Sequence, residues 1–137
     1  MRRSLFISLV APVFVASLAA GGVAVAATAH ATPAKTVTIT SSNCPAAHDY
    51  CFKAATLVVS PSTKVVWKNT SDAPHTVTRC DVAHCKVNGG TGTDPKLKSP
   101  TILPGHTFAF TFHHAGTYRY YCQVHGYVDM HGTITVK

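Results

Sequence analysis

The sequence predicts an all-β sandwich or barrel, rich in antiparallel pairs and built from about seven short strands. Three observations support this fold class. Apolar residues alternate over short runs, Gly, Pro and Asn punctuate those runs, and no segment shows a convincing helical period. Residues 107–112 are the clearest run, because Phe108, Phe110 and Phe112 would share one face of a strand. A chain of 137 residues suits one compact domain.

The remaining elements follow from the same pattern. Turn-forming residues at 61–62, 69–74 and 104–105 divide the chain into short extended runs. We expect strands over 36–40, 56–59 and 64–68, extended backbone over 75–78, a long polar loop over 79–100, and strands over 117–122 and 132–136.

The first 31 residues have the layout of an export signal. Arg2 and Arg3 precede an apolar run over 5–18, and small residues with two possible cleavage sites follow it. A retained membrane anchor is the alternative, because residues 5–27 are numerous enough to span a bilayer. Either interpretation places the domain of residues 32–137 outside the cytoplasm, as a periplasmic, cell-envelope or secreted domain. Only a retained anchor would attach it to a membrane.

The charge balance favours some partners over others. Twelve Lys and Arg against five Asp and no Glu give a formal charge of +7, which falls to +5 if residues 1–31 are removed. A mildly basic domain suits an acidic protein partner or an anionic surface. The basic residues are scattered and form no recognition motif, so we expect no nucleic-acid binding.

Five cysteines indicate two disulfides and one thiol. Their spacing suggests Cys44–Cys51 and Cys80–Cys85, although four cysteines allow three pairings and the sequence does not choose among them. A zinc site using Cys80, Cys85 and the histidine between them would lack a clear fourth ligand. The fifth cysteine, Cys122, is then a free thiol in an oxidising compartment, which requires a reason.

Copper binding supplies that reason. Cys122 ends a predicted strand whose tyrosines share its face, and His125 and Met130 follow across a short loop. His75, after the turn that ends the 64–68 strand, is the best candidate for a second imidazole. A thiolate, two imidazoles and a thioether suit copper better than zinc or calcium, and a trigonal His₂Cys set with a long axial Met is the blue-copper arrangement.

These segments resemble a known family. Residues 116–136, with C-x₂-H-x₄-M spacing, look like the C-terminal end of the plastocyanin-like cupredoxins, and residues 65–77 are similar to the upstream ligand segment of that family. The resemblance implies a Greek-key β-sandwich of about eight strands. It also implies one type 1 copper ion, bound by His75, Cys122, His125 and Met130.

The resemblance further implies an electron carrier that serves redox partner proteins. We expect this carrier to be a monomer and not an enzyme. His125 would be the ligand at the solvent edge, within an apolar docking patch that includes Gly126 and Tyr127. Tyr121 resembles a position used as a remote electron exit, although simple surface packing is an equal alternative. The remaining histidines are expected at the surface or in turns: His48, His84, His106, His113, His114 and His131.

Two departures from the family pattern concern the site itself. Thr76 stands where many members have Asn directly after the upstream histidine. Thr76 keeps the backbone N–H that can bond the copper sulfur, but we expect it to lose the side-chain link across the site. Val124 stands where a proline before the loop histidine is common.

Three other functions fit the sequence less well. Multicopper oxidases and copper nitrite reductases need a second copper centre with histidines typically flanking the cysteine, whereas Tyr121 and Gln123 flank Cys122 here. A protein for copper storage, delivery or resistance is the alternative function. It would cluster Met and His in an open site, yet Met1 and Met130 are the only methionines. A metal-free cupredoxin-like domain would not need all four ligands.

Overall fold

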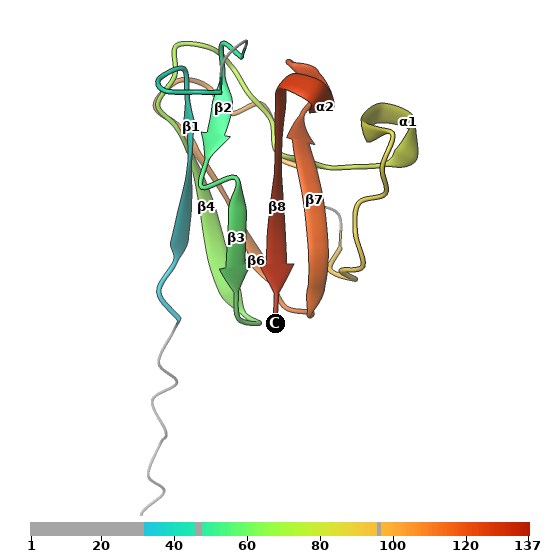
Figure 1. Ribbon diagram of the computed structural model, residues 1–137. Helices are drawn as coiled ribbons and strands as arrows, with labels where there is room; N and C mark the ends of the chain where they lie inside the picture. Colours follow the sequence, from blue (N-terminus) through green and yellow to red (C-terminus); the bar gives the residue numbers. More distant parts are fainter. Residues whose placement is uncertain (1–31, 46–47, 96) are drawn as a thin grey trace, which may run out of the picture.

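The computed structural model describes residues 32–45, 48–95 and 97–137, which form a sandwich of two four-stranded sheets (Figure 1). The sheets have the orders β2-β1-β4-β6 and β3-β8-β7-β5. The strands are β1 (Lys35–Thr40), β2 (Cys51–Lys53), β3 (Thr56–Val59), β4 (Thr63–Asn69), β5 (Thr78–Arg79), β6 (Thr107–Phe112), β7 (Gly116–Cys122) and β8 (Met130–Val136). The eight-stranded β-sandwich is confirmed.

Each sheet combines antiparallel pairs with one parallel pair. β1 runs parallel to β4 in the first sheet, and β3 runs parallel to β8 in the second. β7 is antiparallel to β8, so the end of β7 adjoins the start of β8. Figure 1 shows these two points at the same end of the sandwich as the end of β4, opposite the C-terminus. This arrangement places the predicted ligands at one end of the molecule.

Some short elements were missed by sequence reasoning. β2 lies where no strand was predicted, because three residues are too few to show alternation. Two one-turn helices, α1 (Val82–Cys85) and α2 (Gly126–Asp129), also contradict the expectation of no helix. α1 begins inside the predicted 79–100 loop, where the Asp81 carboxylate accepts a hydrogen bond from the His84 N–H as its N-cap.

The core fills the space between the two sheets with aromatic and β-branched side chains. Trp67 of β4 is fully buried and packs edge-on against Tyr120 of β7, with ring centroids 5.4 Å apart. Phe112 is also fully buried, and Phe108 and Phe110 pack against the same cluster, so the predicted common face of these three rings is confirmed. The core supports the inner end of β7, which carries Cys122.

The predicted disulfides are present. Cys44 is bonded to Cys51 and Cys80 to Cys85, which removes the thiols that a zinc site would need. Among the residues that the structure describes, Cys122 is the free cysteine, and it is buried. The proposed signal peptide or anchor of residues 1–31 lies outside the described residues. In the described part of the chain, no helix is long and apolar enough to cross a membrane.

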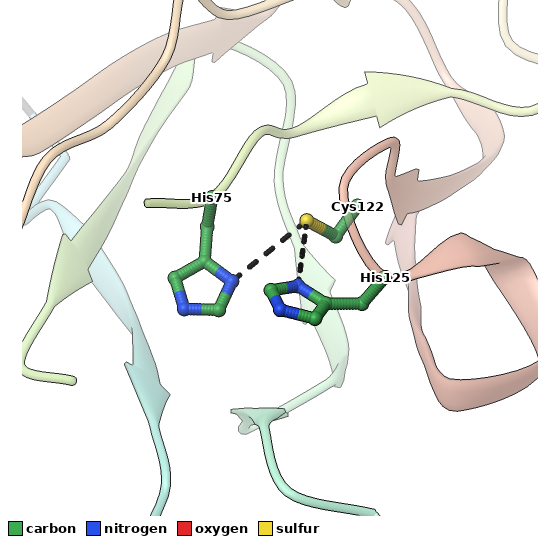
Figure 2. A group of neighbouring side chains, drawn as sticks. All are labelled: His75, Cys122 and His125. Atoms are coloured by element: carbon green, nitrogen blue, oxygen red, sulfur yellow. Dashed lines mark hydrogen bonds between the residues drawn. The ribbon is translucent and has the colours of Figure 1, made fainter. Parts of the chain in front are cut away.

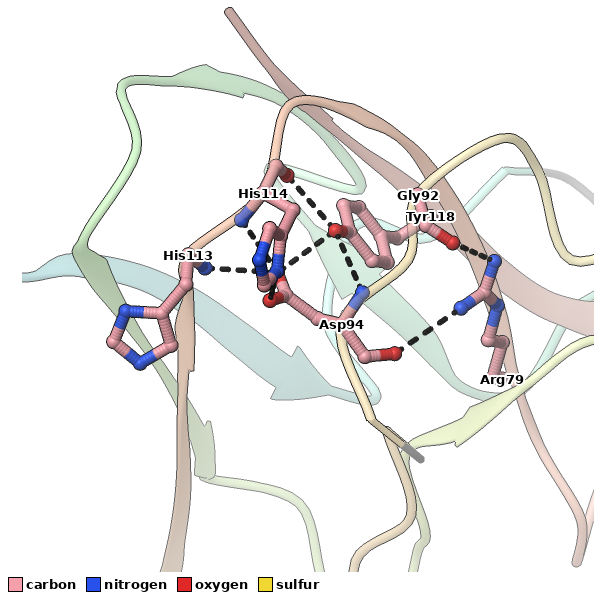
Figure 3. A network of polar contacts seen from close by, with 6 residues as sticks. All are labelled: Arg79, Gly92, Asp94, His113, His114 and Tyr118. Atoms are coloured by element: carbon pink, nitrogen blue, oxygen red, sulfur yellow. Dashed lines mark hydrogen bonds and ion pairs between the residues drawn. The ribbon is translucent and has the colours of Figure 1, made fainter.

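A buried carboxylate fixes the long loop to the other end of the sandwich (Figure 3). Asp94 accepts hydrogen bonds from the Tyr118 hydroxyl at 2.7 Å and from the backbone N–H groups of His113 and His114 at 2.8 and 3.1 Å. The side chain of Asp94 is fully buried, and its carboxylate also pairs with the His114 ring. Burial acts to raise the pKa of Asp94, but these hydrogen bonds outweigh it and lower the pKa.

Candidate metal centre

Three donor atoms converge at the end of the sandwich where β7 stops. The Sγ of Cys122 lies 3.7 Å from Nδ1 of His75 and 3.5 Å from Nδ1 of His125 (Figure 2). The ligand atoms of the three residues all lie within 4.8 Å of one another. His75 and Cys122 are fully buried and His125 is half-buried. The structure therefore brings together three of the four ligands predicted from the sequence.

The loop after β7 has a shape that returns His125 toward the thiol. Gly126 forms an isolated β-bridge with Cys122 and adopts a φ of 82°, a conformation that glycine accepts without strain. α2 follows at once, and its end is closed by a hydrogen bond from the Met130 N–H to the Gly126 carbonyl oxygen. This tight return makes the three-residue spacing from Cys122 to His125 compatible with one metal ion.

His75 is held by its backbone and by its second ring nitrogen. Its backbone pairs with Ile102 through two hydrogen bonds, of 3.1 and 2.8 Å. Its Nε2 lies 2.8 Å from the hydroxyl of Ser71, which donates in turn to Oδ1 of buried Asn69. With Nε2–H donating to Ser71, Nδ1 remains free to bind a metal, as in other metal-binding histidines with an outer hydrogen bond.

The protonation state of His75 also suits a ligand. Burial and, to a smaller extent, the nearby His125 lower the pKa of His75 to about 4, although Asp72 partly opposes this shift. The imidazole is therefore neutral at physiological pH and has a lone pair available for a metal ion.

The donor geometry fits a metal ion of the first transition series. Bonds of about 2.3 Å to sulfur and about 2.0 Å to nitrogen, at a trigonal angle of about 120°, would place sulfur and nitrogen about 3.7 Å apart. The separations of 3.7 and 3.5 Å from Cys122 match this value. One thiolate and two imidazoles are donors that suit copper.

Met130 stands at the same end of the molecule. It is the first residue of β8, is 1% exposed and belongs to the same hydrophobic cluster as Cys122. His131, next to it, points outward and stacks on Tyr127 with ring centroids 4.6 Å apart. The burial of Met130 is compatible with an axial thioether, and its role as a ligand is a proposal taken up below.

Thr76 corrects one expectation. Its backbone N–H donates to the Cys122 Sγ at 3.4 Å, as predicted. Its hydroxyl also accepts a hydrogen bond from the Gln123 N–H at 2.8 Å, so the predicted loss of the side-chain link across the site was wrong. The Thr76 hydroxyl can reach the backbone of the ligand loop because Thr76 follows His75 and Gln123 follows Cys122, and these two ligands lie side by side in the site.

Tyr50 was missed by sequence reasoning. Its ring centroid lies 5.0 Å from that of His75 and 4.7 Å from that of His125, and its hydroxyl donates to Asp72 at 3.1 Å. Tyr50 belongs to the loop closed by the Cys44–Cys51 disulfide. No local sequence signal indicates its role, because only the fold brings this loop over the two imidazoles.

Tyr121 is more enclosed than a surface residue. It is 4% exposed and packs with the Cys80–Cys85 disulfide, and its ring stacks at 6.2 Å on that of His84. The other histidines match expectation, since His48 is half-buried and the following are exposed: His84, His106, His113, His114 and His131.

The fold and the site together define a mononuclear copper protein, and comparison with known proteins agrees. Residues 39–137 match the family model described as copper binding proteins of the plastocyanin/azurin family. The chain belongs to this family, it is a copper-binding electron-transfer protein, and it binds one copper ion.

The matches to individual relatives span most of the length of each relative. The chain is 32% identical over 89 residues to the plastocyanin of Lactuca sativa, across 63% of this chain and 87% of the relative. It is 29% identical over 88 residues to plastocyanin A/B of Petroselinum crispum, with the same coverage. Members of this family are generally electron carriers and not enzymes.

Solved structures support the same fold. A purple cupredoxin from Nitrosopumilus maritimus aligns with a TM-score of 0.59 at 24% identity, over 75% of this chain and 99% of that one. A reduced amicyanin mutant aligns with a TM-score of 0.54 at 26% identity, over 76% of this chain and 82% of that one. Both alignments extend over at least three quarters of this chain.

Proposed function

We propose that the protein is an exported type 1 blue copper protein that shuttles single electrons between redox proteins, with copper bound by His75, Cys122, His125 and Met130. When bound, copper supplies a one-electron couple between Cu(II) and Cu(I). We expect the protein to hold the donors in one arrangement for both states, because His75, which pairs with Ile102 between β4 and β5, and Cys122, at the end of β7, are both fully buried. Small rearrangement between the two states favours fast electron transfer.

The convergence of three buried or half-buried donors within 4.8 Å carries this proposal. Cys122 receives a hydrogen bond from the Thr76 N–H, which stabilises a thiolate. Ser71 orients His75, and Tyr50 covers both imidazoles. A site for copper storage or delivery would instead expose its ligands for exchange with a partner.

The remaining parts of the proposal concern location and assembly. The layout of residues 1–31 supports export, and two disulfides are typical of proteins outside the cytoplasm. We expect a monomer that meets redox proteins through the half-buried edge of His125. The proposal needs no substrate-binding site, because an electron carrier changes only the oxidation state of its own metal ion.

A redox titration of the copper-loaded protein separates carrier from delivery protein. The carrier should lose its colour on reduction and regain it on oxidation without losing metal, and the ratio of the two states should change tenfold for each step of about 59 mV, as for one electron. Transfer of Cu(I) to an added chelator during the reduced phase, faster than reoxidation, would favour copper delivery.

A further inference from the structure

A cavity of about 500 Å³ lies at the β5 edge of the second sheet. It is bounded by β5, by α1 and by the end of β7, and none of its described lining residues is a proposed copper ligand. Leu97, Tyr121 and Cys80 give it an apolar wall. Its volume lies within the range of about 300–1,000 Å³ that is usual for small-molecule sites, so the cavity can hold a small molecule.

A histidine and an aspartate form a hydrogen-bonded pair in the rim of this cavity. Nδ1 of His84 lies 2.8 and 3.0 Å from the two carboxylate oxygens of Asp81, and both side chains are more than half exposed. The backbone N–H and the ring of His84 donate to this carboxylate and lower the pKa of Asp81, so the carboxylate stays ionised. With Nδ1–H donating to Asp81, Nε2 carries the lone pair, and it makes no hydrogen bond within the described part of the chain. An ionised carboxylate behind the ring stabilises the imidazolium that forms when Nε2 accepts a proton.

The pair is held in place next to the copper thiolate. The Cys80–Cys85 disulfide closes the short segment that carries both residues. The ring of His84 stacks on that of Tyr121, with centroids 6.2 Å apart and planes 20° apart. Tyr121 directly precedes Cys122 in the chain. A ligand in this cavity would therefore contact both a proton acceptor and the residue next to the copper thiolate.

The charges of the cavity favour an uncharged ligand. Among the lining residues that the structure describes, Arg79 and Lys98 balance Asp81 and Asp94 at neutral pH. The Arg79 guanidinium is also occupied, because it donates to the Gly92 carbonyl oxygen at 2.6 Å. An aromatic wall suits a flat ring, and a base at the rim suits a hydroxyl that can release a proton. Together these features describe an uncharged aromatic molecule with ring hydroxyl groups.

We propose, building on the proposed function, that this cavity binds a hydroquinone-class reductant, which gives electrons to the copper site beside Tyr121 and protons to Nε2 of His84. The reaction is balanced by two protein molecules. One hydroquinone loses two electrons and two protons to become a quinone, and each Cu(II) protein accepts one electron to become Cu(I) protein. His84 takes up each proton from a ring O–H group and releases it to solvent. Removal of the proton makes the ring a better electron donor, so the loss of the electron depends on the base.

Binding is measured first, by titrating isotope-labelled protein with hydroquinone and following the amide signals by NMR. The Cu(I) protein serves for this titration, because it is already reduced and does not react. The amide signals of Asp81, His84 and Tyr121 should shift together and saturate. The metal-free protein should show the same shifts, so the cavity is tested independently of copper. An absence of saturation, or shifts confined to the loop around His125, would overturn the proposal.

Electron transfer is measured next, by anaerobic stopped-flow mixing of the Cu(II) protein with excess hydroquinone. The rate of colour loss should level off at high hydroquinone concentration, because the donor reacts from the cavity. His84→Gln removes the base and should lower the limiting rate at least about tenfold. The matched control His113→Gln changes an exposed histidine that follows β6, outside the cavity, and should leave the limiting rate unchanged.

Ferrocyanide separates this role of His84 from a general effect on the copper site. It gives one electron and no proton, so it should reduce His84→Gln and wild type at equal rates. A hydroquinone rate that stays proportional to concentration, or an equal loss of rate with both reductants in His84→Gln, would contradict the proposal. A protein without blue colour would instead refute the proposed function, and the NMR titration would still decide whether the cavity binds hydroquinone.

Discussion

Replacing Thr76 with valine tests how the two ligand segments are joined. Valine has nearly the shape of threonine and keeps the backbone N–H that donates to Cys122, but it removes the hydroxyl that accepts from the Gln123 N–H at 2.8 Å. Loss of one such partly buried hydrogen bond, with its donor left unpaired, should cost about 1–2 kcal/mol in the free energy of unfolding.

Thr78→Val is a matched control. Thr76 and Thr78 are similarly buried, at 8% and 9% exposure, but the Thr78 hydroxyl has no hydrogen-bond partner among the described residues. Removing an unpaired buried hydroxyl should leave stability unchanged or raise it slightly. The pair of variants therefore separates the hydrogen bond from the effect of a β-branched substitution.

Urea unfolding of the copper-loaded protein, followed by the fluorescence of the single Trp67, gives both values. With an m-value of about 1.5 kcal/mol per molar urea, the midpoint of Thr76→Val should fall by about 1 M. Equal urea midpoints for Thr76→Val and wild type, or an equal fall of the midpoint in Thr78→Val, would refute a stabilising hydrogen bond between Thr76 and Gln123.

Three further changes probe the site and its scaffold. Ser71→Ala removes the partner of His75 Nε2 and should weaken copper binding about 10–100-fold, measured by competition with a chelator; unchanged affinity would contradict the role of Ser71. Asp94→Asn should cost about 2–4 kcal/mol at pH 7 in urea unfolding. Because folding lowers the pKa of Asp94, the contribution of its carboxylate to stability is complete above the ordinary pKa of 3.8 and is lost as the pH falls through the folded pKa. The unfolding free energies of wild type and Asp94→Asn should therefore converge in acid. A difference between them that stays constant with pH would contradict this role of Asp94. Gly132→Ala would collide with the Tyr120 ring and should cost about 1–3 kcal/mol, whereas a neutral result would mean that the ring can move aside.

The fold and the main donors were predictable because each leaves a periodic or spaced trace in the sequence. The alternating phenylalanines of β6 identify a strand, and the odd cysteine with its following histidine identifies a ligand loop. The two disulfides were also suggested by spacing, since each joins cysteines no more than seven residues apart.

The parts that were missed depend on tertiary contacts. Tyr50 covers His75 only because the β1–β2 loop folds over the end of the sandwich, and no local pattern reports that contact. The Thr76 link was judged wrongly because its outcome depends on where the Gln123 N–H points, not on residue type. β2, α1 and α2 are each too short to produce a period.

The visible spectrum of the copper-loaded protein tests the central claim most directly. The account predicts an intense blue band for the wild type with one equivalent of Cu(II), and no such band in Cys122→Ser, which lacks the thiolate that gives rise to it. Circular dichroism should show the same β-sandwich in both. A colourless wild-type complex, or a blue band that survives in Cys122→Ser, would contradict a type 1 site at Cys122.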